Sequence, residues 1–117
     1  MPALVAATFQ PPVDRAALRR ELGVEGEPLI GMVSTFQPSR RHDVGIEAFH
    51  QVRQARPGAR LVLIGDGGLE AILRIAVVSR ELTGAVTFPG YQPGADFVRW
   101  AQAFDQVAAG DARALII

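Results

Sequence analysis

Two adjacent cations, Arg40 and Arg41, follow the first predicted strand in the run TFQPSRRH. The same run carries two hydroxyl groups, one of them on Thr35, and the imidazole of His42. Arginine beside the start of a helix attracts phosphate, because free backbone N–H groups and the helix dipole add to the guanidinium charge. The run therefore predicts an anion-binding loop. The alternative is a solvated arginine pair on an ordinary loop.

The run GDGG, at residues 65–68, forms a second candidate loop after the second predicted strand. Glycine lets a backbone approach a ligand closely, and the carboxylate of Asp66 can accept hydrogen bonds from a sugar or from neighbouring N–H groups. The run is not a complete dinucleotide-binding fingerprint, because Glu70 stands where the third glycine belongs. It predicts either a ligand-contacting loop or only a tight turn between a strand and a helix.

A third loop, PGYQPG at residues 89–94, follows the third predicted strand. Its backbone groups and the aromatic face of Tyr91 suit stacking on a base or a sugar, and the alternative is a rigid turn. Ligands of open parallel sheets bind beyond the carboxyl ends of the strands. We therefore expect the three loops at one edge of the sheet.

Several other chemistries are excluded by residues that the chain lacks. All twelve basic residues are arginine, and there is no lysine and no cysteine. Schiff-base catalysis, a P-loop lysine, disulfides, thiol catalysis and cysteine-ligated zinc are therefore excluded. His42 and His50 lie eight residues apart without a cluster of further ligands, so we expect no metal site and assign no catalytic residue.

The composition of the chain is that of a globular domain. Of its 117 residues 49% are hydrophobic and 21% are charged, and twelve acidic residues balance twelve basic ones. A neutral chain offers no general attraction to nucleic acid or to an anionic membrane. The longest apolar stretch is too short to span a bilayer, and the N-terminus lacks the basic start of a signal peptide. We therefore expect a soluble cytoplasmic domain.

Strand and helix signals alternate along the chain. Short apolar runs predict strands at residues 29–34 and 60–64, and further strands are expected at 86–88 and 104–108. Helices are expected at 15–22, from 43 to the stop at Pro57 and Gly58, at 69–82 and at 96–103. No two strands have a tight hairpin spacing, so βαβ units with a parallel sheet are expected. The predicted fold class is α/β, a Rossmann-like parallel sheet with flanking helices. Residues 1–28 are predicted to be an N-terminal arm and linker helix, and 29–117 a partial Rossmann-like domain.

The order of these runs along the chain resembles a known enzyme family. The runs are VSTFQPSRRHDVGIEAFHQV, PGARLVLIGDGGLEAIL, VTFPGY and FDQVAAG. Together they resemble the C-terminal, donor-binding half of a GT-B glycosyltransferase, of the retaining family called group 1 or family 4. The resemblance covers about residues 29–109, and the upstream run VDRAALRRELGV is similar to the segment that joins the two domains of that family.

The resemblance implies a set of residues that bind a sugar nucleotide. In that family an Arg after the first strand and a Lys a few residues later hold the diphosphate of the donor. The Lys of the family matches Arg40 in this sequence, which keeps the positive charge. The Arg of the family matches Thr35, which carries no charge. Arg41 is a candidate to supply the missing positive charge. The remaining matches are the glycine turn at Gly65, Asp66 and Gly67 and the base-packing loop at Gly90 and Tyr91.

Two parts of the resembled family have no match in this sequence. One is a later helix with two Glu residues eight apart, since the last acids here are Asp105 and Asp111, and the other is the acceptor-binding domain. The expected function is therefore the donor-binding portion of a retaining glycosyltransferase that uses a UDP- or GDP-sugar. No separate cofactor is expected, and no turnover by this chain alone. The alternative is a degenerate Rossmann-like interaction module that no longer binds nucleotide.

The predicted arrangement also bears on partners. A strand order of 3-2-1-4 would leave the fourth strand as an exposed apolar edge, and such edges pair with other chains. The helix expected at 69–82 is apolar nearly all round, which predicts a covered outer face. We therefore expect a homodimer, with or without exchanged elements, or a missing partner lobe.

Overall fold

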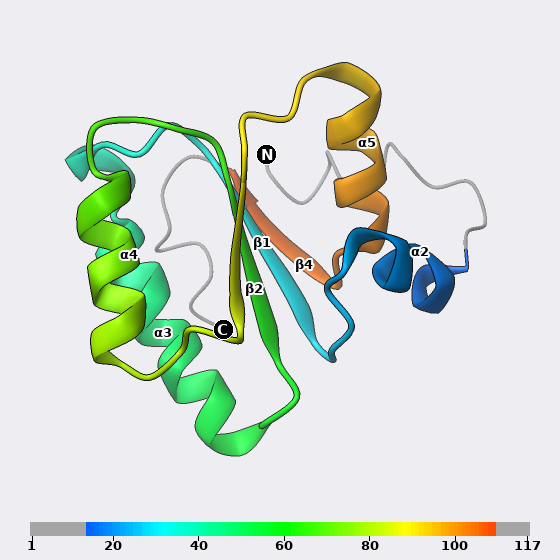
Figure 1. The fold of residues 1–117 in the computed structure, drawn as a ribbon, viewed down its shortest axis with the longest axis horizontal. Coiled ribbons are helices and arrows are strands. Elements are labelled where there is room, and N and C mark those ends of the chain that lie inside the picture. Colours follow the sequence, from blue (N-terminus) through cyan, green and yellow to red (C-terminus); the bar gives the residue numbers. More distant parts are fainter. Residues whose placement is uncertain (1–13, 110–117) are drawn as a thin grey trace.

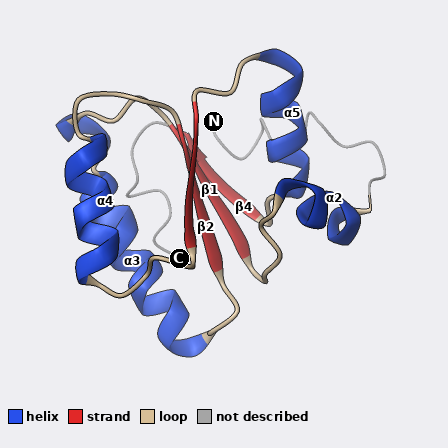
Figure 2. Cartoon of the chain, viewed as in Figure 1, coloured by secondary structure: helices blue, strands red, loops and turns tan. Residues whose placement is uncertain are grey.

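A four-stranded parallel sheet lies between two layers of helices (Figure 1, Figure 2). The computed structural model describes residues 14–109. The strands are β1 (Leu29–Val33), β2 (Arg60–Ile64), β3 (Val86–Gly90) and β4 (Gln106–Ala109). The helices are α2 (Arg15–Leu22), the 3₁₀ turn η1 (Pro38–Arg40), α3 (His42–Ala55), α4 (Glu70–Ser79) and α5 (Gly94–Ala103). The predicted α/β fold class is confirmed.

The sheet has the order β3-β2-β1-β4, and each neighbouring pair of strands is parallel. At the centre of the sheet Gly31 of β1 pairs with Val62 of β2 on one side and Val107 of β4 on the other. This is the strand order for which β4 was expected to form an edge of the sheet. Because every strand runs in the same direction, all the carboxyl ends meet at one edge, which is the upper edge in Figure 1.

Alternate residues of the strands point into two separate cores. Ile30 and Met32 of β1 pack with α3 and α4, whereas Leu29 faces α2 and α5. Strand β2 alternates in the same way, with Leu61 and Leu63 in the first core and its intervening apolar residues in the second. Both faces of the central strands are therefore buried, which accounts for their continuous apolar runs.

Helix α2 begins and ends as its sequence predicts. The side chain of Asp14 accepts a hydrogen bond from the backbone N–H of Ala17 at 3.1 Å, and Gly23 takes the left-handed conformation that ends the helix. The buried Arg19 then ties α2 to the sheet, because its Nε donates to the carbonyl of Ala103 at 2.8 Å and its Nη2 lies 2.9 Å from a carboxylate oxygen of Asp105. These contacts join helix α2 to the same domain as the strands.

Several element boundaries differ from those predicted. Helix α4 begins at Glu70 and ends at Ser79, because a residue with positive φ, Glu81, turns the chain before Leu82. Helix α5 begins at Gly94 rather than at 96, and β4 begins at Gln106 rather than at 104. Strand β3 extends through Pro89 and Gly90, which an edge strand tolerates because no ladder bond is needed on its outer side.

The outer side of α4 carries exposed apolar side chains in the described chain. Ile72, Ile75 and Val78 are 60%, 67% and 62% exposed, respectively. Strand β4 forms an edge of the sheet within residues 14–109. Both features are those on which the homodimer was predicted, and the dimer itself stays a prediction.

Candidate functional site

A cavity of about 230 Å³ opens at the carboxyl ends of β1, β2 and β3. Its lining residues are Val33, Ser34, Thr35, Ile64, Gly65, Asp66, Tyr91 and Gln92. Four of the eight sequence-predicted site residues lie together here, namely Thr35, Gly65, Asp66 and Tyr91. They come from three loops that are far apart in the sequence. The cavity lies where ligands of open parallel sheets bind.

Backbone hydrogen bonds hold these three loops against one another. The N–H of Phe36, after β1, donates to the carbonyl of Asp66 at 2.8 Å. The N–H of Gly65, after β2, donates to the carbonyl of Gly90 at 3.1 Å. The N–H of Ser34 donates to the carbonyl of Ile64 at 3.2 Å, so the walls of the cavity continue the hydrogen bonding of the sheet beyond its strands.

Glycine is required at two positions of the second loop. Gly65 and Gly67 have φ values of +139° and +148°, which residues with a side chain rarely adopt. A Cβ on Gly65 would collide with the carbonyl oxygen of Ser34, and one on Gly67 would lie 2.7 Å from the carbonyl oxygen of Phe36. The close approach of the first two loops therefore depends on both glycines.

The third loop presents an aromatic ring and an amide to the cavity. Tyr91 is 71% exposed, so one face of its ring is accessible to a ligand. Gln92 beside it is held from two sides, because its Nε2 donates to the carbonyl of Pro89 at 3.0 Å and its Oε1 accepts from the indole N–H of Trp100 at 3.1 Å. The ring of Trp100 is buried beside Phe104, so this residue packs in the core and does not line the cavity.

The predicted cations lie beside the cavity rather than on its lining. Arg40 ends the turn η1 and is exposed, and no carboxylate in the described part of the chain forms an ion pair with it. Arg41 precedes α3 and points two N–H groups at the carboxylate of Asp43, both at 3.2 Å. These hydrogen bonds from Arg41 lower the pKa of Asp43, so part of the charge of Arg41 is already compensated. Arg40 is the cation with more of its charge available to an anion.

His42 is not part of the exposed loop, contrary to the expectation from the sequence. It is the first residue of α3, and 2% of its surface is exposed. Its Nε2 lies 3.1 Å from the hydroxyl oxygen of Ser34. Its ring packs edge to face against the ring of Phe36, with 5.0 Å between the two ring centroids. Burial lowers the pKa of His42, and the nearby Arg40 lowers it further, against an opposing effect of Asp43. The imidazole is therefore neutral near pH 7.

The buried imidazole predicts that stability falls with acidification. The unfolded histidine has a pKa of about 6.5, and the folded value is lower, so the unfolded chain binds the proton first. The free energy of unfolding should therefore decrease as the pH falls below about 6.5. The decrease should stop once the pH is below the lowered pKa of His42 in the folded state. Thermal melts between about pH 7 and pH 5 measure this change in stability.

The variant His42→Gln should show a flatter profile of stability against pH. A profile unchanged from that of the wild type would contradict the prediction. Asp43 does not interfere, because its lowered pKa affects stability only in more acidic solution.

Sequence reasoning missed four residues of the cavity, namely Val33, Ser34, Ile64 and Gln92. Three of them lie at the ends of β1 and β2, directly before the predicted loops, and Gln92 follows Tyr91. The available signal was their position, since any residue next to the carboxyl end of a parallel strand is a candidate wall residue. Gly67 and Gly90 do not line the cavity, but they shape the loops that do.

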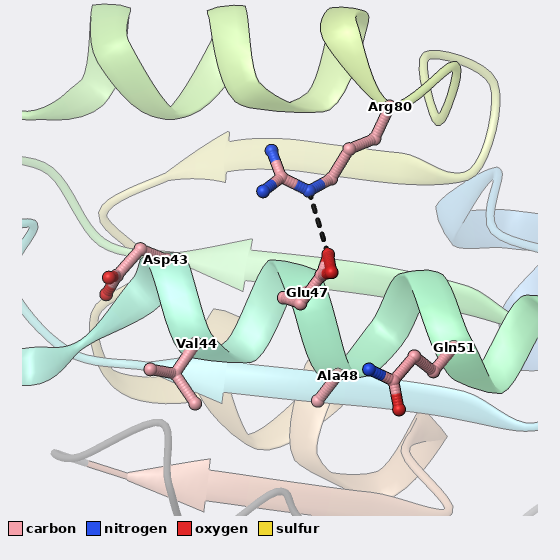
Figure 3. Close-up of a pocket in the computed structure, with 6 residues that line it drawn as sticks. All are labelled: Asp43, Val44, Glu47, Ala48, Gln51 and Arg80. Carbon is pink, nitrogen blue, oxygen red and sulfur yellow. Dashed lines mark hydrogen bonds and ion pairs between the residues drawn. The ribbon is translucent and has the colours of Figure 1, made fainter.

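A larger hollow of about 410 Å³ lies elsewhere, on the outer side of α3 (Figure 3). It is lined by Asp43, Val44, Glu47, Ala48, Gln51 and Arg80. An ion pair crosses it, with the Nε of Arg80 3.0 Å from a carboxylate oxygen of Glu47 (Figure 3). None of the eight predicted site residues belongs to this hollow. Glu47 and Arg80 pair with each other and Asp43 pairs with Arg41, so the charges of this hollow are compensated and the candidate site remains the smaller cavity at the strand ends.

The structure shows neither a metal-binding cluster nor a membrane-spanning helix within residues 14–109. No cluster of three or more histidine, aspartate or glutamate side chains there is arranged to hold a metal ion. No helix in the same range is long and apolar enough to cross a membrane.

The sequence pattern of the family Glycosyl transferases group 1 matches residues 14–108. The chain belongs to this family. The match includes α2, the whole sheet down to β4, and the three loops around the cavity. The resemblance expected from the sequence is therefore confirmed.

Two relatives of the chain are much longer proteins than the part that it matches. A D-inositol 3-phosphate glycosyltransferase of Segniliparus rotundus is 33% identical over 102 residues, which are 83% of this chain and 23% of that protein. A GDP-mannose-dependent monoacylated alpha-(1-6)-phosphatidylinositol monomannoside mannosyltransferase of Corynebacterium glutamicum is 39% identical over 64 residues, 54% of this chain and 17% of that protein. The group 1 chain thus spans less than a quarter of the length of these relatives.

Solved structures place the group 1 chain in one domain of the GT-B fold. The C-terminal domain of a glycosyl transferase group 1 family protein, LpcC of Francisella tularensis, superposes with a TM-score of 0.75 at 20% identity. That match covers 87% of this chain and 55% of that domain structure. Anabaena HepE, solved in complex with UDP, has a TM-score of 0.69 at 25% identity, over 87% of this chain and 28% of HepE. The described fold is therefore part of a GT-B C-terminal domain.

Proposed function

We propose that this chain binds the nucleotide of a sugar donor for a group 1 glycosyltransferase, in the cavity at the strand ends. The observation that carries the proposal is the convergence of Thr35, Gly65, Asp66 and Tyr91 around one opening of about 230 Å³. The volume lies below the usual range of ligand pockets, so the cavity suits part of a nucleotide rather than a whole sugar donor. The other walls of a complete donor site would come from the rest of the enzyme.

Each loop has its own chemical task in that complex. The exposed ring of Tyr91 can stack on the base, as aromatic side chains do with nucleotides. The exposed carboxylate of Asp66 can accept hydrogen bonds from ribose or sugar hydroxyls. Arg40, beside the N-terminal end of the 14-residue helix α3, can attract the diphosphate through its charge and the helix dipole. Arg41 contributes less, because Asp43 already holds its guanidinium.

Two comparisons support a sugar nucleotide as the ligand class. Anabaena HepE was solved with UDP, with UDP and glucose, and with UDP-glucose. The Corynebacterium glutamicum relative is described as GDP-mannose-dependent. These proteins use different bases, so we propose a UDP- or GDP-sugar without choosing between them.

We further propose that the chain alone has no turnover and that the complete enzyme retains the anomeric configuration of the donor sugar. Glycosyl transfer needs groups that stabilise the leaving diphosphate in a site protected from water. The cavity is bounded by three loops of one domain and offers no second wall for an acceptor. The isolated chain should therefore bind a nucleotide without transferring a sugar.

A titration followed by amide NMR tests the binding proposal. We expect UDP or GDP to shift the signals of Gly65, Gly67, Tyr91 and Arg40, while residues of the hollow in Figure 3 such as Gln51 stay unchanged. Arg40→Gln should weaken binding roughly five- to tenfold, since a charge-assisted contact contributes about 1–1.5 kcal/mol. Arg56→Gln is the matched control, because Arg56 is also exposed but lies at the opposite end of α3.

The same titration distinguishes the alternative function. No shift at millimolar UDP and GDP would reject the donor-binding proposal and favour a Rossmann-like interaction module without a nucleotide. Equal affinities of the Arg40→Gln and Arg56→Gln variants would leave nucleotide binding intact but reject the role of Arg40.

A further inference from the structure

Ser34 and His42 form a polar pair in the wall of the cavity. Ser34 lies directly after β1 and lines the opening, half-buried. The buried His42, at the start of α3, places its Nε2 3.1 Å from the Ser34 hydroxyl oxygen. The pair therefore joins the interior of the domain to the cavity through one hydrogen bond.

The surroundings of His42 determine the direction of that hydrogen bond. Its other ring nitrogen, Nδ1, is buried and has no hydrogen-bond partner within the described chain. A buried N–H group without an acceptor is costly, whereas a bare ring nitrogen gives up only a weaker interaction with water. The neutral ring is therefore more stable with its proton on Nε2, where it is donated to the Ser34 oxygen. The hydroxyl proton of Ser34 is then free to point into the cavity.

The position of this hydroxyl is fixed from several sides. The backbone N–H of Ser34 is bonded to Ile64, and the ring of His42 is held edge to face against Phe36. The carbonyl of Ser34 lies against Gly65, where a side chain could not fit. A donor fixed in this way loses little conformational entropy when it binds an acceptor.

We propose that Ser34 donates a hydrogen bond to the diphosphate of the nucleotide, and that His42 is the positioning residue that orients its hydroxyl. The inference rests on the proposed function, and it adds a neutral donor next to Thr35. Thr35 carries a hydroxyl and no charge, so Ser34 adds a second neutral hydrogen-bond donor to the same wall of the cavity. Ser34 touches the ligand, whereas His42 acts only through Ser34.

The test compares UDP affinity among variants by calorimetry or by amide NMR. Ser34→Ala should weaken UDP binding roughly ten- to hundredfold, the effect of losing one hydrogen bond to a charged group. Ser39→Ala is the matched control, because Ser39 is an exposed hydroxyl of the same loop that does not line the cavity, and its affinity should stay at the wild-type value. Equal affinities of Ser34→Ala and wild type would overturn the inference.

The role of His42 is tested by a conservative and a disruptive substitution. His42→Gln places an amide N–H close to the position of Nε2 and should keep most of the UDP affinity, whereas His42→Leu removes the donor and should match Ser34→Ala. Equal losses in both His42 variants would reject the positioning role. If His42→Leu fails to fold, the Ser34→Ala, Ser39→Ala and His42→Gln comparison decides. If the wild-type chain binds no UDP, both the proposed function and this inference are rejected. If the wild-type chain binds UDP and Ser34→Ala binds it equally well, only this inference is rejected.

Discussion

Replacing Gly65 by alanine should abolish nucleotide binding and lower the free energy of unfolding by about 2–4 kcal/mol. The backbone φ of +139° at Gly65 is rarely adopted by a residue with a Cβ. The added Cβ would also collide with the backbone carbonyl oxygen of Ser34, which cannot move like a flexible side chain. Relief requires the loops after β1 and β2 to separate, and those loops form the walls of the cavity.

Gly68→Ala is the matched control for this variant. Gly68 lies three residues further along the same run, without a positive φ, and a Cβ there would meet no atom within 4 Å. Its thermal stability and UDP affinity should stay near the wild-type values. Denaturant unfolding and UDP titration of both variants measure the difference. If Gly65→Ala were as stable and as active in binding as Gly68→Ala, the close contact of the two loops would not be essential to the site.

Replacing Arg19 by methionine should lower the free energy of unfolding by about 2–4 kcal/mol. The guanidinium of Arg19 is buried between α2, the end of α5 and β4, where it bonds the carbonyl of Ala103 and pairs with Asp105. Methionine keeps the apolar length of the side chain but leaves both oxygens without this partner. The carboxylate of Asp105 also accepts a hydrogen bond from the backbone N–H of Leu29 at 2.7 Å. Losing the Arg19 partner of Asp105 should therefore also weaken the start of strand β1.

Arg20→Met is the control for Arg19→Met, because it changes the same residue type one position along α2. Arg20 is exposed, and no ion pair involves it in the part of the chain that the structure describes. Its substitution should change the unfolding free energy by less than about 0.5 kcal/mol. Urea unfolding of the two variants would contradict the prediction if their midpoints shifted by similar amounts.

These two predictions separate the parts of the molecule that stabilise it from those that shape the site. Arg19 acts at the amino-terminal side of the sheet, where α2 joins the body of the domain. Gly65 acts at the opposite edge, where the three loops meet. Arg19→Met should therefore reduce stability while the fraction that remains folded keeps its affinity for UDP, whereas Gly65→Ala should affect both quantities.

The sequence predicted the elements better than their ends. Continuous apolar runs located β1 and β2, because a strand buried on both faces has no polar positions. The ends of α4 and α5 were wrong by a few residues, since helix limits depend on local turns such as the positive φ of Glu81. Strand β4 began later than its apolar signal, because Phe104 contributes to the core beside Trp100 instead of pairing in the sheet.

The candidate site was predictable to the level of loops. Residue types alone indicated the glycine turn and Tyr91, and parallel topology implied that their loops share one edge. The sequence did not indicate that Arg41 is held by Asp43 or that His42 turns inward to meet Ser34. These contacts depend on the angle at which α3 leaves the turn η1, and the left-handed conformation of Arg41 sets that angle.

The sequence by itself determined the fold class, the strand positions and the family of this chain, because hydrophobic periodicity and motif order are properties of the linear chain. Only the tertiary structure decided which groups form the cavity and which of the cations keeps its charge available. The physical reason is that hydrogen bonds and ion pairs form between whichever groups the folded backbone brings within about 3 Å. The hydroxyl of Ser34, ordinary in the sequence, became a candidate ligand-binding group only when the fold placed His42 behind it.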